Sequence, residues 1–573
     1  MKRYPLLTGL GLLVVACSGN SPPPSAPALP SASAAVAKPA LAEQSPTATQ
    51  ASAVVGRVTV AIVVDQLAAW VADERLPLLP KSGGFARLMR EGTWYKDVRF
   101  SHAITETAPG HASLYSGKSP HEHGIVANEV LSSGKASAFL LDQNTKVVGP
   151  EGIRADAGSS AIALIGDVAA DKFRAQHPQG KVYSFSVKDR GAIFGGGRHP
   201  DVVAWFDPGS VAFVTSTAFG DKLPDWVVNL GSTTAVTARA AQTWTVQDQA
   251  WVTHSVCKDD AEGEGNLGNY KTTFPHQPNL AAKPFAAYRV NPDSDKLLLE
   301  MGLASLDHSP KDAPVFLAIS LSANDYIGHI FGPDSWEAWD ELQRLDASLE
   351  WFFAELDKRK GSSNWTAVLS ADHGVAPLPE VSRMLAKQGN KEHPKDARPL
   401  ELTDRVEAAA LEKVATQAAE KALGKGTWIA KVVDPYLYFS DDAKKLEPKK
   451  RQKLSRAVTN ALLKQPSVAK IFETKGSATT CPPSSDESLD ALACNSILTG
   501  RGGDYFIALK SGHFFDTGYV PGAGTSHGNA SLYDRSVPLF VRPAIANQAG
   551  AAVAAPQSFA LFSKELERQM SDK

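Results

Sequence analysis

"VTVAIVVD", residues 58–65, is an apolar run that ends in a carboxylate. Three later stretches follow the same plan, namely "KVYSFSVKDR" (181–190), "PVFLAISLSAND" (314–325) and "WTAVLSADHG" (365–374). Continuous apolar runs of this length, closed by a polar residue and a loop, are typical of strands buried on both faces of a parallel sheet. The four runs therefore predict the centre of an α/β fold.

Amphipathic helical patterns lie between these strands. In residues 335–357 apolar side chains recur along one helical face, and Asp334 or Ser335 can cap the start of the helix. The recurring residues are Trp336, Trp339, Leu342, Leu345, Leu349, Phe352 and Leu356. This alternation predicts a mostly parallel central sheet with helices on both faces.

Length and composition set the organisation of the chain. With 573 residues, 43% of them hydrophobic, the chain can bury one large core. We expect one large domain over residues 56–545, with cap-like insertions at about 200–310 and 380–510 and a C-terminal segment over 546–573. The formal charge of −2 leaves no basic excess for a polynucleotide, so no nucleic-acid partner is expected.

The N-terminus has the pattern of an export signal. Lys2 and Arg3 precede an apolar stretch, 5–16, which is too short to span a bilayer. Residues 14–17, "VVAC", resemble the bacterial lipobox, in which Cys17 would carry the lipid; an ordinary cleaved signal is the alternative. We therefore expect a lipoprotein signal over 1–17 and export to the bacterial cell envelope. Cys17 would be the only attachment to a membrane, on the periplasmic side of the outer membrane or at the cell surface.

Residues 18–55 are dominated by Pro, Ala and Ser, which predicts a disordered tether. Among the remaining cysteines, Cys481 and Cys494 flank a short polar loop, and export makes a disulfide between them plausible. Such a bond would contribute about 3 kcal/mol for a loop of that length. Cys257 has no predicted role.

Residues able to bind a metal follow the predicted strands. Ligands of α/β sheets bind beyond the carboxyl ends of the strands, and three aspartates and three histidines fall there or in a glycine-rich loop near the C-terminus. They are Asp65, Asp325, His329, Asp372, His373 and His527. Mixed nitrogen and oxygen ligands of this kind suit zinc.

The stretch "ITETAPGHASLYSGKSPHEHGI", residues 104–125, presents a threonine beside a Pro-Gly corner. A hydroxyl at the start of a helix lies where backbone N–H groups converge and an anion is favoured. A simple capped helix start is the alternative for an isolated T-A-P-G.

The order of these motifs resembles the alkaline phosphatase superfamily, from Val58 to about Arg542. The local motifs are similar to those of its PafA-type bacterial alkaline phosphatases, which are also related to type I phosphodiesterases and nucleotide pyrophosphatases. The resemblance makes Thr107 in "TAPGH" the nucleophile and gives Asn128 in "HGIVAN", with Lys188 and Arg190 in "SVKDRGAI", the binding of phosphate.

The resemblance also implies two zinc ions per chain. One would be held by Asp325, His329 and His527, and the other by Asp65, Asp372, His373 and the Thr107 oxygen. Thr105 has no counterpart in the family pattern, and His111, His121 and His123 are expected to be structural.

The implied reaction is hydrolysis of phosphate monoesters through a phosphothreonine intermediate. Two metals about 4 Å apart can stabilise both the attacking and the leaving oxygen. Lys188 and Arg190 are two residues apart at a strand end, so we expect both to point to one side of the sheet and bind one phosphate. Together with Asn128 they favour a monoester, since a diester carries one charge fewer.

Two other functions are consistent with these motifs. The same metal core could serve a phosphodiesterase or nucleotide pyrophosphatase, and an inactive lipoprotein could bind phosphorylated ligands. Residues 481–485, "CPPSS", lack the arginine of a sulfatase motif, which disfavours sulfate esters. We expect small phosphorylated substrates and a monomer; the insertions that would contact the leaving group carry no recognisable signal.

Overall fold

The computed structural model describes residues 56–571, apart from 268–269, 279, 281–287, 389–400, 477, 484, 517 and 546–549. The predictions for residues 1–17 and 18–55, including the lipid anchor at Cys17, lie outside the described residues. The described residues belong to one unit, Ala53–Lys573. None of their helices is both long and apolar enough to cross a membrane.

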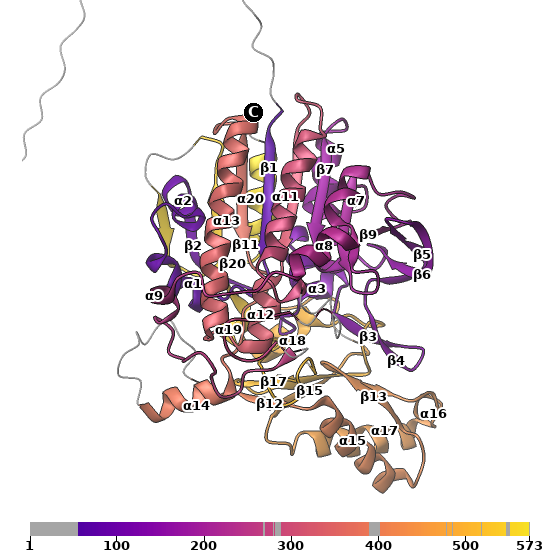
Figure 1. The fold of residues 1–573 in the computed structure, drawn as a ribbon. Coiled ribbons are helices and arrows are strands. Elements are labelled where there is room, and N and C mark those ends of the chain that lie inside the picture. Colours follow the sequence, from indigo (N-terminus) through magenta and orange to yellow (C-terminus); the bar gives the residue numbers. More distant parts are fainter. Residues whose placement is uncertain are drawn as a thin grey trace, which may run out of the picture. The chain divides into compact units, whose positions relative to one another are not determined.

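A twelve-stranded sheet forms the centre of this unit (Figure 1). Its five middle strands, from β11 to β8, are parallel, whereas both flanks contain antiparallel pairs. In spatial order the strands are β19 (Ala551–Val553), β2 (Thr93–Arg99), β18 (Ser536–Arg542), β11 (Trp365–Ser370), β1 (Val58–Val64), β10 (Val315–Leu321), β7 (Lys181–Ser186), β8 (Val202–Asp207), β9 (Ala212–Ser216), β5 (Leu141–Gly149) and β6 (Gly152–Ser159), with β20 (Gln557–Ser558) against β2.

The apolar runs of the sequence become the buried middle of this sheet. Every residue of β1, β10 and β11 is buried. Their register sets Val64 opposite Leu321 and Val63 opposite Ser370. Parallel strands in register end at one edge, so the polar residues that follow them meet there.

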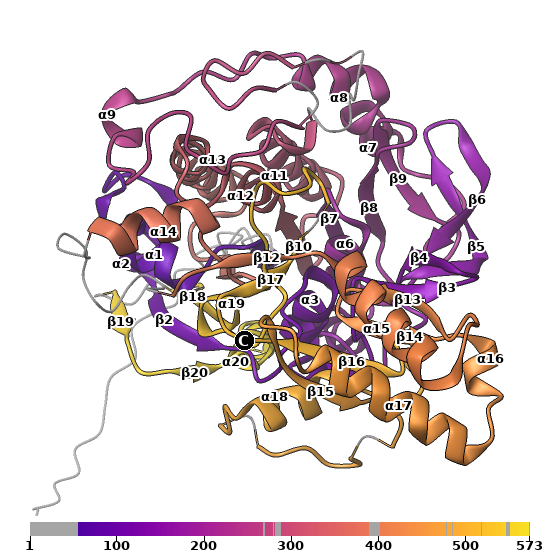
Figure 2. The ribbon, with the colours of Figure 1, turned by 90° about the horizontal axis from the view of Figure 1, so that it is seen from below.

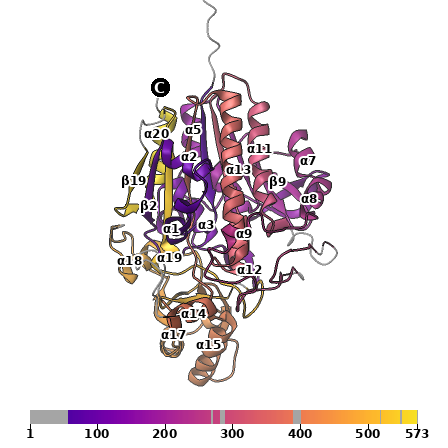
Figure 3. The ribbon, with the colours of Figure 1, turned by 60° about the vertical axis from the view of Figure 1, so that its left-hand side comes forward.

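Helices cover both faces of the sheet (Figures 2 and 3). Two long helices, α11 and α13, lie on one face, and α3, α5, α6 and α20 lie on the other. The helices of this part of the chain are α1 (Ala69–Arg75), η1 (Leu76–Leu78), α2 (Gly84–Glu91), α3 (Thr107–Ser116), α4 (Pro120–His123), α5 (Ala169–Gln176), α6 (Asp189–Gly196), α7 (Asp225–Gly231), α8 (Thr233–Ala240), α9 (Gln249–Val252), α11 (Asp293–Asp307), α12 (Ala323–Phe331), α13 (Trp336–Lys360), α14 (Pro379–Gln388), α19 (Leu532–Arg535) and α20 (Leu561–Ser571).

Helix α13 confirms the amphipathic pattern found in the sequence. Ser335 is its N-cap, and its side chain accepts the N–H of Ala338 at 3.1 Å. The seven apolar residues of the predicted stripe are buried, with the exception of Trp336, which is partly buried. The apolar stripe therefore faces the core.

Residues 404–515 contain smaller sheets and a core of their own. A four-stranded sheet has the order β13 (Ile429–Val433), β14 (Tyr436–Phe439), β16 (Tyr505–Leu509) and β15 (Val468–Glu473). Two helices, α15 (Ala408–Leu423) and α17 (Pro448–Leu462), bury Leu411, Leu454 and Val458 against it. The same residues also form β12 (Asp404–Val406) paired with β17 (His513–Phe515), α16 (Asp441–Lys444) and α18 (Leu489–Ser496). Outside this range, β3 (Glu129–Ser132) pairs with β4 (Lys135–Ala138).

The second predicted insertion thus contains a small α/β layer, whereas the first, 200–310, contributes β8 and β9 to the central sheet itself. Figure 1 shows the small layer below the ends of the parallel strands. Tyr436 on β14 reaches across and donates its hydroxyl proton to the carbonyl of Val126 at 3.3 Å. The small layer is therefore in contact with the loops that follow α4.

The predicted disulfide is confirmed. Cys481 and Cys494 are bonded, with their Cα atoms 5.6 Å apart. Cys494 lies in α18, whose Leu492 carbonyl and Ser496 hydroxyl both accept the N–H of Ala103. Cys257 is buried in a separate small cluster with Leu378 and Val381.

Candidate functional site

The six aspartates and histidines predicted to bind metal lie at the carboxyl edge of the parallel strands. Asp65 follows β1 directly, and Asp372 and His373 follow β11. Helix α12 begins two residues after β10 and carries Asp325 and His329 one turn apart. His527 comes from the glycine-rich loop between β17 and α19.

Asp325, His329 and His527 form one group. The Nε2 atom of His329 lies 3.2 Å from Asp325 Oδ1, and the Nε2 atom of His527 lies 3.7 Å from the same oxygen. The two Nε2 atoms are 3.3 Å apart. Three ligand atoms that converge this closely can bind one metal ion.

Asp65, Asp372 and His373 form the second group. His373 Nε2 lies 3.4 Å from Asp65 Oδ1 and 3.5 Å from Asp372 Oδ2. The rings of His373 and His527 stack with centroids 3.6 Å apart, which joins the two groups. Asp325, His373 and His527 also have ligand atoms within 4.8 Å of one another. The six residues therefore form one continuous cluster, and their ligand atoms can be assigned to metal sites in more than one way.

Each imidazole of the cluster is held in the same way. The Nδ1 atoms of His329, His527 and His373 bond to backbone carbonyls of Thr525, Thr105 and Gly374, at 2.9, 2.7 and 3.0 Å. A carbonyl only accepts, so each Nδ1 carries the proton and each Nε2 is left with its lone pair. This is the orientation in which proteins present histidine to a metal.

Electrostatics support metal binding. Burial, together with Asp325 and Asp372, raises the pKa of Asp65 well above its ordinary value. Burial lowers the pKa of His373 to about 3 and also lowers that of His527, so both imidazoles are neutral at neutral pH. Neutral imidazoles and carboxylates are the forms that ligate metals.

The cluster also has unsatisfied buried atoms. Asp65 Oδ1 and His373 Nε2 are buried without a hydrogen-bond partner among the described residues. Asp65 Oδ2 lies 2.6 Å from Lys188 Nζ, and Asp372 Oδ2 lies 3.0 Å from His111 Nδ1. Three buried aspartates around one lysine leave negative charge that divalent cations would neutralise. The residues present therefore fit a divalent metal centre.

Thr107 lies at the border of the two groups. It is the first residue of α3 and is 1% exposed, and Lys188 Nζ lies 3.3 Å from its Oγ1. Gly110 explains the glycine of the T-A-P-G motif, because a Cβ there would lie 2.2 Å from the carbonyl oxygen of Asp372. The motif brings the start of α3 into contact with the end of β11.

Lys188 is the central cation of the site. Its Nζ lies 2.6 Å from Asp65 Oδ2 and 2.6 Å from Asp325 Oδ2. Burial alone would lower the pKa of Lys188, but Asp325 and Asp65 outweigh burial and raise it, so the ammonium stays charged. In turn, despite burial, Lys188 and His329 hold the pKa of Asp325 well below its ordinary value.

The expected placement of Lys188 and Arg190 by strand alternation is wrong. Strand β7 ends at Ser186, Lys188 is the N-cap of α6, and Arg190 is the second residue of that helix. The turn into α6 directs Lys188 into the cluster, whereas Arg190 is partly exposed. The Nη1 atom of Arg190 lies 3.6 Å from Asp189 Oδ1. The Nε of Arg190 is buried without a hydrogen-bond partner among the described residues.

Asn128 lies beside the nucleophile candidate. Its Oδ1 accepts the N–H of Ala108 at 2.8 Å, in the first turn of α3. Its backbone N–H donates to Glu106 Oε2 at 2.6 Å. With its carbonyl oxygen engaged, the side chain of Asn128 has its NH₂ group left to donate to an anion.

Sequence reasoning missed several residues that orient the cluster. Gln66 donates from Nε2 to Asp325 Oδ1 at 2.8 Å and from its backbone to Asp372 Oδ1 at 3.2 Å. His111 Nδ1 lies 3.0 Å from Asp372 Oδ2, and the carbonyl of Thr105 holds His527. Adjacency to Asp65 was the only sequence signal for Gln66, and a backbone carbonyl leaves no signal at all.

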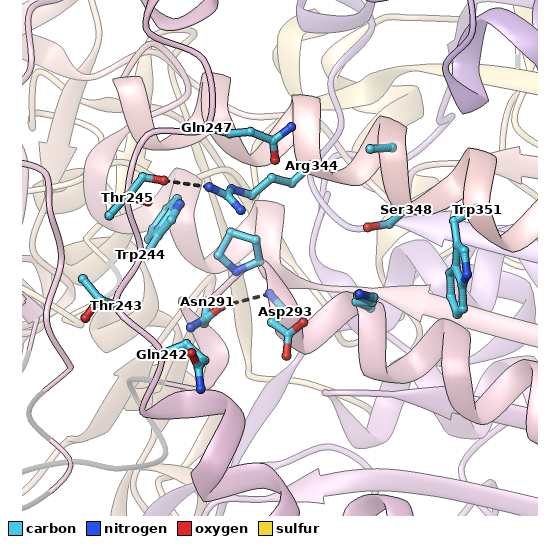
Figure 4. Close-up of a pocket in the computed structure, with 13 residues that line it drawn as sticks. Gln242, Thr243, Trp244, Thr245, Gln247, Asn291, Asp293, Arg344, Ser348 and Trp351 are labelled. Atoms are coloured by element: carbon cyan, nitrogen blue, oxygen red, sulfur yellow. Dashed lines mark hydrogen bonds between the residues drawn. The ribbon is translucent and has the colours of Figure 1, made fainter.

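The cleft drawn in Figure 4 lies elsewhere. It has a volume of about 550 Å³ and lies between α11, α13 and residues 242–247. Polar and aromatic side chains such as Arg344 and Trp351 line it, and it contains none of the predicted site residues.

Comparisons with known proteins agree on one family. The family model described as type I phosphodiesterase / nucleotide pyrophosphatase matches residues 59–457. The chain is 30% identical over 496 residues to alkaline phosphatase PafA of Elizabethkingia meningoseptica, covering 84% of this chain and 86% of that protein. It is 28% identical to alkaline phosphatase PhoV of Synechococcus elongatus, over 84% of each. The crystal structure of wild-type PafA superimposes with a TM-score of 0.76 at 27% identity, covering 90% of this chain and 97% of that one.

Proposed function

Because this chain belongs to the type I phosphodiesterase / nucleotide pyrophosphatase family and is a phosphoester hydrolase of the alkaline phosphatase kind, we propose that it hydrolyses phosphate monoesters through a phosphothreonine on Thr107, at a two-zinc site. The observation that carries the proposal is the position of Lys188. Its ammonium contacts Asp65, Asp325 and the Thr107 hydroxyl at once. One cation therefore links both ligand groups to a single nucleophile.

The two zinc ions would be bound by Asp325, His329 and His527, and by Asp65, Asp372, His373 and the Thr107 oxygen. When bound, they would lower the pKa of a coordinated hydroxyl and neutralise oxygens on both sides of the transferred phosphoryl group. The unsatisfied atoms of Asp65 and His373 support this assignment.

In the first step Thr107 Oγ forms a bond to phosphorus as the bond from phosphorus to the leaving alkoxide breaks. Thr107 loses its proton, and the leaving group gains one. Lys188 donates toward Oγ1 and therefore stabilises the oxygen in its anionic form. Water then cleaves the phosphothreonine, which restores the Thr107 hydroxyl and releases inorganic phosphate.

The non-reacting phosphoryl oxygens need donors that match their charge. Asn128 offers its NH₂ group next to the start of α3, and Arg190 offers a guanidinium from the first turn of α6. A helix start adds backbone N–H groups that favour an anion. A monoester dianion uses the two cationic side chains, Lys188 and Arg190, better than a diester monoanion can.

A substrate panel tests the proposal. The zinc-loaded protein should cleave an aryl phosphate far faster than its methyl diester or the aryl sulfate, and Thr107→Ala should abolish turnover. A preference for the diester would instead indicate a phosphodiesterase, an activity that the description of the family includes. Phosphate binding without any turnover would identify an inactive binding protein.

We further propose that the protein is an exported lipoprotein, anchored through Cys17 in the bacterial cell envelope and acting as a monomer on small phosphorylated compounds. The disulfide between Cys481 and Cys494 supports an oxidising compartment. Cys17→Ser should move the protein from the membrane fraction to the soluble fraction. Retention in the membrane would contradict the anchor.

A further inference from the structure

Glu106 and Asn128 exchange hydrogen bonds beside the nucleophile candidate. Glu106 directly precedes Thr107, is 5% exposed, and accepts the backbone N–H of Asn128 with its Oε2 at 2.6 Å. In return, Asn128 Oδ1 accepts the backbone N–H of Ala108 at 2.8 Å. The two hydrogen bonds therefore join the start of α3 to the loop after α4 at two points.

Glu106 does not cap its own helix. It is the N-cap residue of α3, but its side chain makes no hydrogen bond to the first turn. An N-cap side chain ordinarily accepts the N–H of the second or third helical residue. In α3 the third residue is Pro109, which has no N–H, and the N–H of the second, Ala108, goes to Asn128. Asn128 therefore caps α3 from outside the helix.

Hydrogen bonds fix both the backbone and the side chain of Asn128. Its backbone N–H donates to Glu106, its carbonyl accepts the N–H of Phe139 at 2.9 Å, and its side-chain oxygen accepts from Ala108. With these three groups engaged, the NH₂ group is the donor that Asn128 can offer to an anion. Because the carboxamide is planar, the contact with Ala108 also sets the direction of the NH₂ group.

We propose that Glu106 is a positioning residue, which holds the backbone of Asn128 so that the Asn128 NH₂ group meets a non-reacting phosphoryl oxygen. This role rests on the proposed function, because the oxygen belongs to the phosphoryl group that Thr107 attacks. The Oε1 atom of Glu106 is buried without a hydrogen-bond partner among the described residues. A half-satisfied buried carboxylate costs stability, and such a cost is expected at a functional site.

The length of Glu106 is the decisive property. Ser, Thr, Asp and Asn are the residues that favour N-cap positions, because their short side chains reach the first turn of the same helix. A short side chain at position 106 would compete with Asn128 for the N–H of Ala108 and would not reach the backbone of Asn128. Such a substitution should therefore keep the helix but release Asn128, which separates positioning from a purely structural role.

Phosphate binding by variants of Glu106 tests the inference. In Glu106→Ser the Tm should be kept or raised, while the Kd of the zinc-loaded protein for inorganic phosphate should rise about 10–100-fold, the range for one hydrogen bond to a charged group. The kcat/KM for an aryl phosphate should fall by the same factor. Glu106→Asp keeps the charge but lacks the reach and should behave like Glu106→Ser, whereas Glu106→Gln keeps an acceptor at full reach and should retain the wild-type values. The matched control, Glu129→Ser, changes an exposed glutamate next to Asn128 and should also leave both values unchanged.

A double variant shows whether Glu106 acts through Asn128. If it does, Glu106→Ser should cause no further loss in an Asn128→Ala background. Losses that add, wild-type phosphate affinity in Glu106→Ser and Glu106→Asp, or an equal loss in Glu106→Gln would each overturn the inference. Failure of the proposed reaction has a different signature, since the Thr107→Ala and substrate experiments report it, whereas the Kd for phosphate is measured without turnover.

Discussion

Lys188 carries the charge balance of the phosphoester site. It contacts Asp65 and Asp325 at 2.6 Å each and Thr107 at 3.3 Å. Lys188→Ala removes the donor to the nucleophile and a cation next to the phosphoryl group. We expect kcat/KM for an aryl phosphate to fall about 10²–10³-fold, as for the loss of one preorganised donor. Lys146→Ala, at an exposed surface position, should leave kcat/KM unchanged.

Arg190 tests the choice between monoester and diester. Since it lies at the partly exposed rim of the site, it should contact an oxygen that carries charge only in the monoester. Arg190→Ala should lower kcat/KM for the aryl phosphate by at least ten times more than for the methyl diester. Equal losses for both substrates would show that Arg190 does not read the second charge.

A substitution of Gln66 should change metal affinity and fold stability in different directions. It has a φ of +69°, a conformation that glycine adopts without strain, and its side chain bonds to Asp325. Gln66→Gly should keep or raise the Tm of the metal-free protein, because the backbone strain is relieved. Metal retention against a chelator should weaken about 10–100-fold, because a ligand loses its orienting partner. Unchanged retention would mean that Asp325 needs no such support.

The metal-binding aspartates and histidines could be predicted from the ends of the strands, because polar residues that follow buried apolar runs are conspicuous in the sequence. The resemblance of the T-A-P-G motif to the alkaline phosphatase superfamily, not the motif alone, singled out Thr107. Gln66, His111 and the Thr105 carbonyl could not be predicted, since their roles depend on partners hundreds of residues away or on the backbone alone.

Helix α3 depends on close contact with the end of β11. Gly110→Ala would place a Cβ 2.2 Å from the Asp372 carbonyl oxygen, a backbone atom that cannot move aside. We expect a loss of about 1–3 kcal/mol in the free energy of unfolding and a larger relative loss of activity, because Thr107 moves with the helix. Gly149→Ala, where the nearest atom is a side-chain carbon at 3.7 Å, is the matched control. Normal activity in Gly110→Ala would contradict the packing argument.

A contact at the start of helix α2 predicts how the stability of the protein depends on pH. Asp346 on α13 accepts the N–H of Phe85 at 2.8 Å, and burial raises the pKa of Asp346 from 3.8 to about 6. Between these two pH values the folded protein binds the proton more tightly than the unfolded chain does. The contribution of Asp346 to stability is therefore complete below about pH 4 and is lost as the pH rises through 6.

In Asp346→Asn the side chain does not titrate, but its amide oxygen can still accept the N–H of Phe85. Relative to the wild type, the variant should gain on the order of 2–3 kcal/mol in the free energy of unfolding between pH 4 and pH 7. Denaturant titrations of both proteins at several pH values measure the difference. A difference that does not change with pH would show that Asp346 has an ordinary pKa.

The central elements could be predicted from the sequence because period and length identify them. The four apolar runs became β1, β7, β10 and β11, and α13 begins directly after Ser335, one of the two predicted caps. The turn from β7 into α6 could not be predicted. Strand alternation assumed that the strand continued to Arg190, whereas it ends at Ser186.

Over the whole molecule, the sequence established the α/β class but not the flanks of the sheet. The antiparallel neighbours β18 and β9 come from distant parts of the chain, and nothing local specifies which strand they join. The small layer over residues 404–515 was expected only as an insertion. Its contact with the Val126 loop depends on tertiary packing that no sequence period encodes.

Only the complete fold brings Thr107 together with Asp65, Asp325, Asp372 and His527. The most direct measurement is peptide mapping of the zinc-loaded protein after an acid quench during turnover of an aryl phosphate. We predict phosphate bound covalently to the hydroxyl of Thr107, and no such adduct in Thr107→Ala. Steady turnover with no phosphorylated Thr107, or a phosphate found on another residue, would contradict the account.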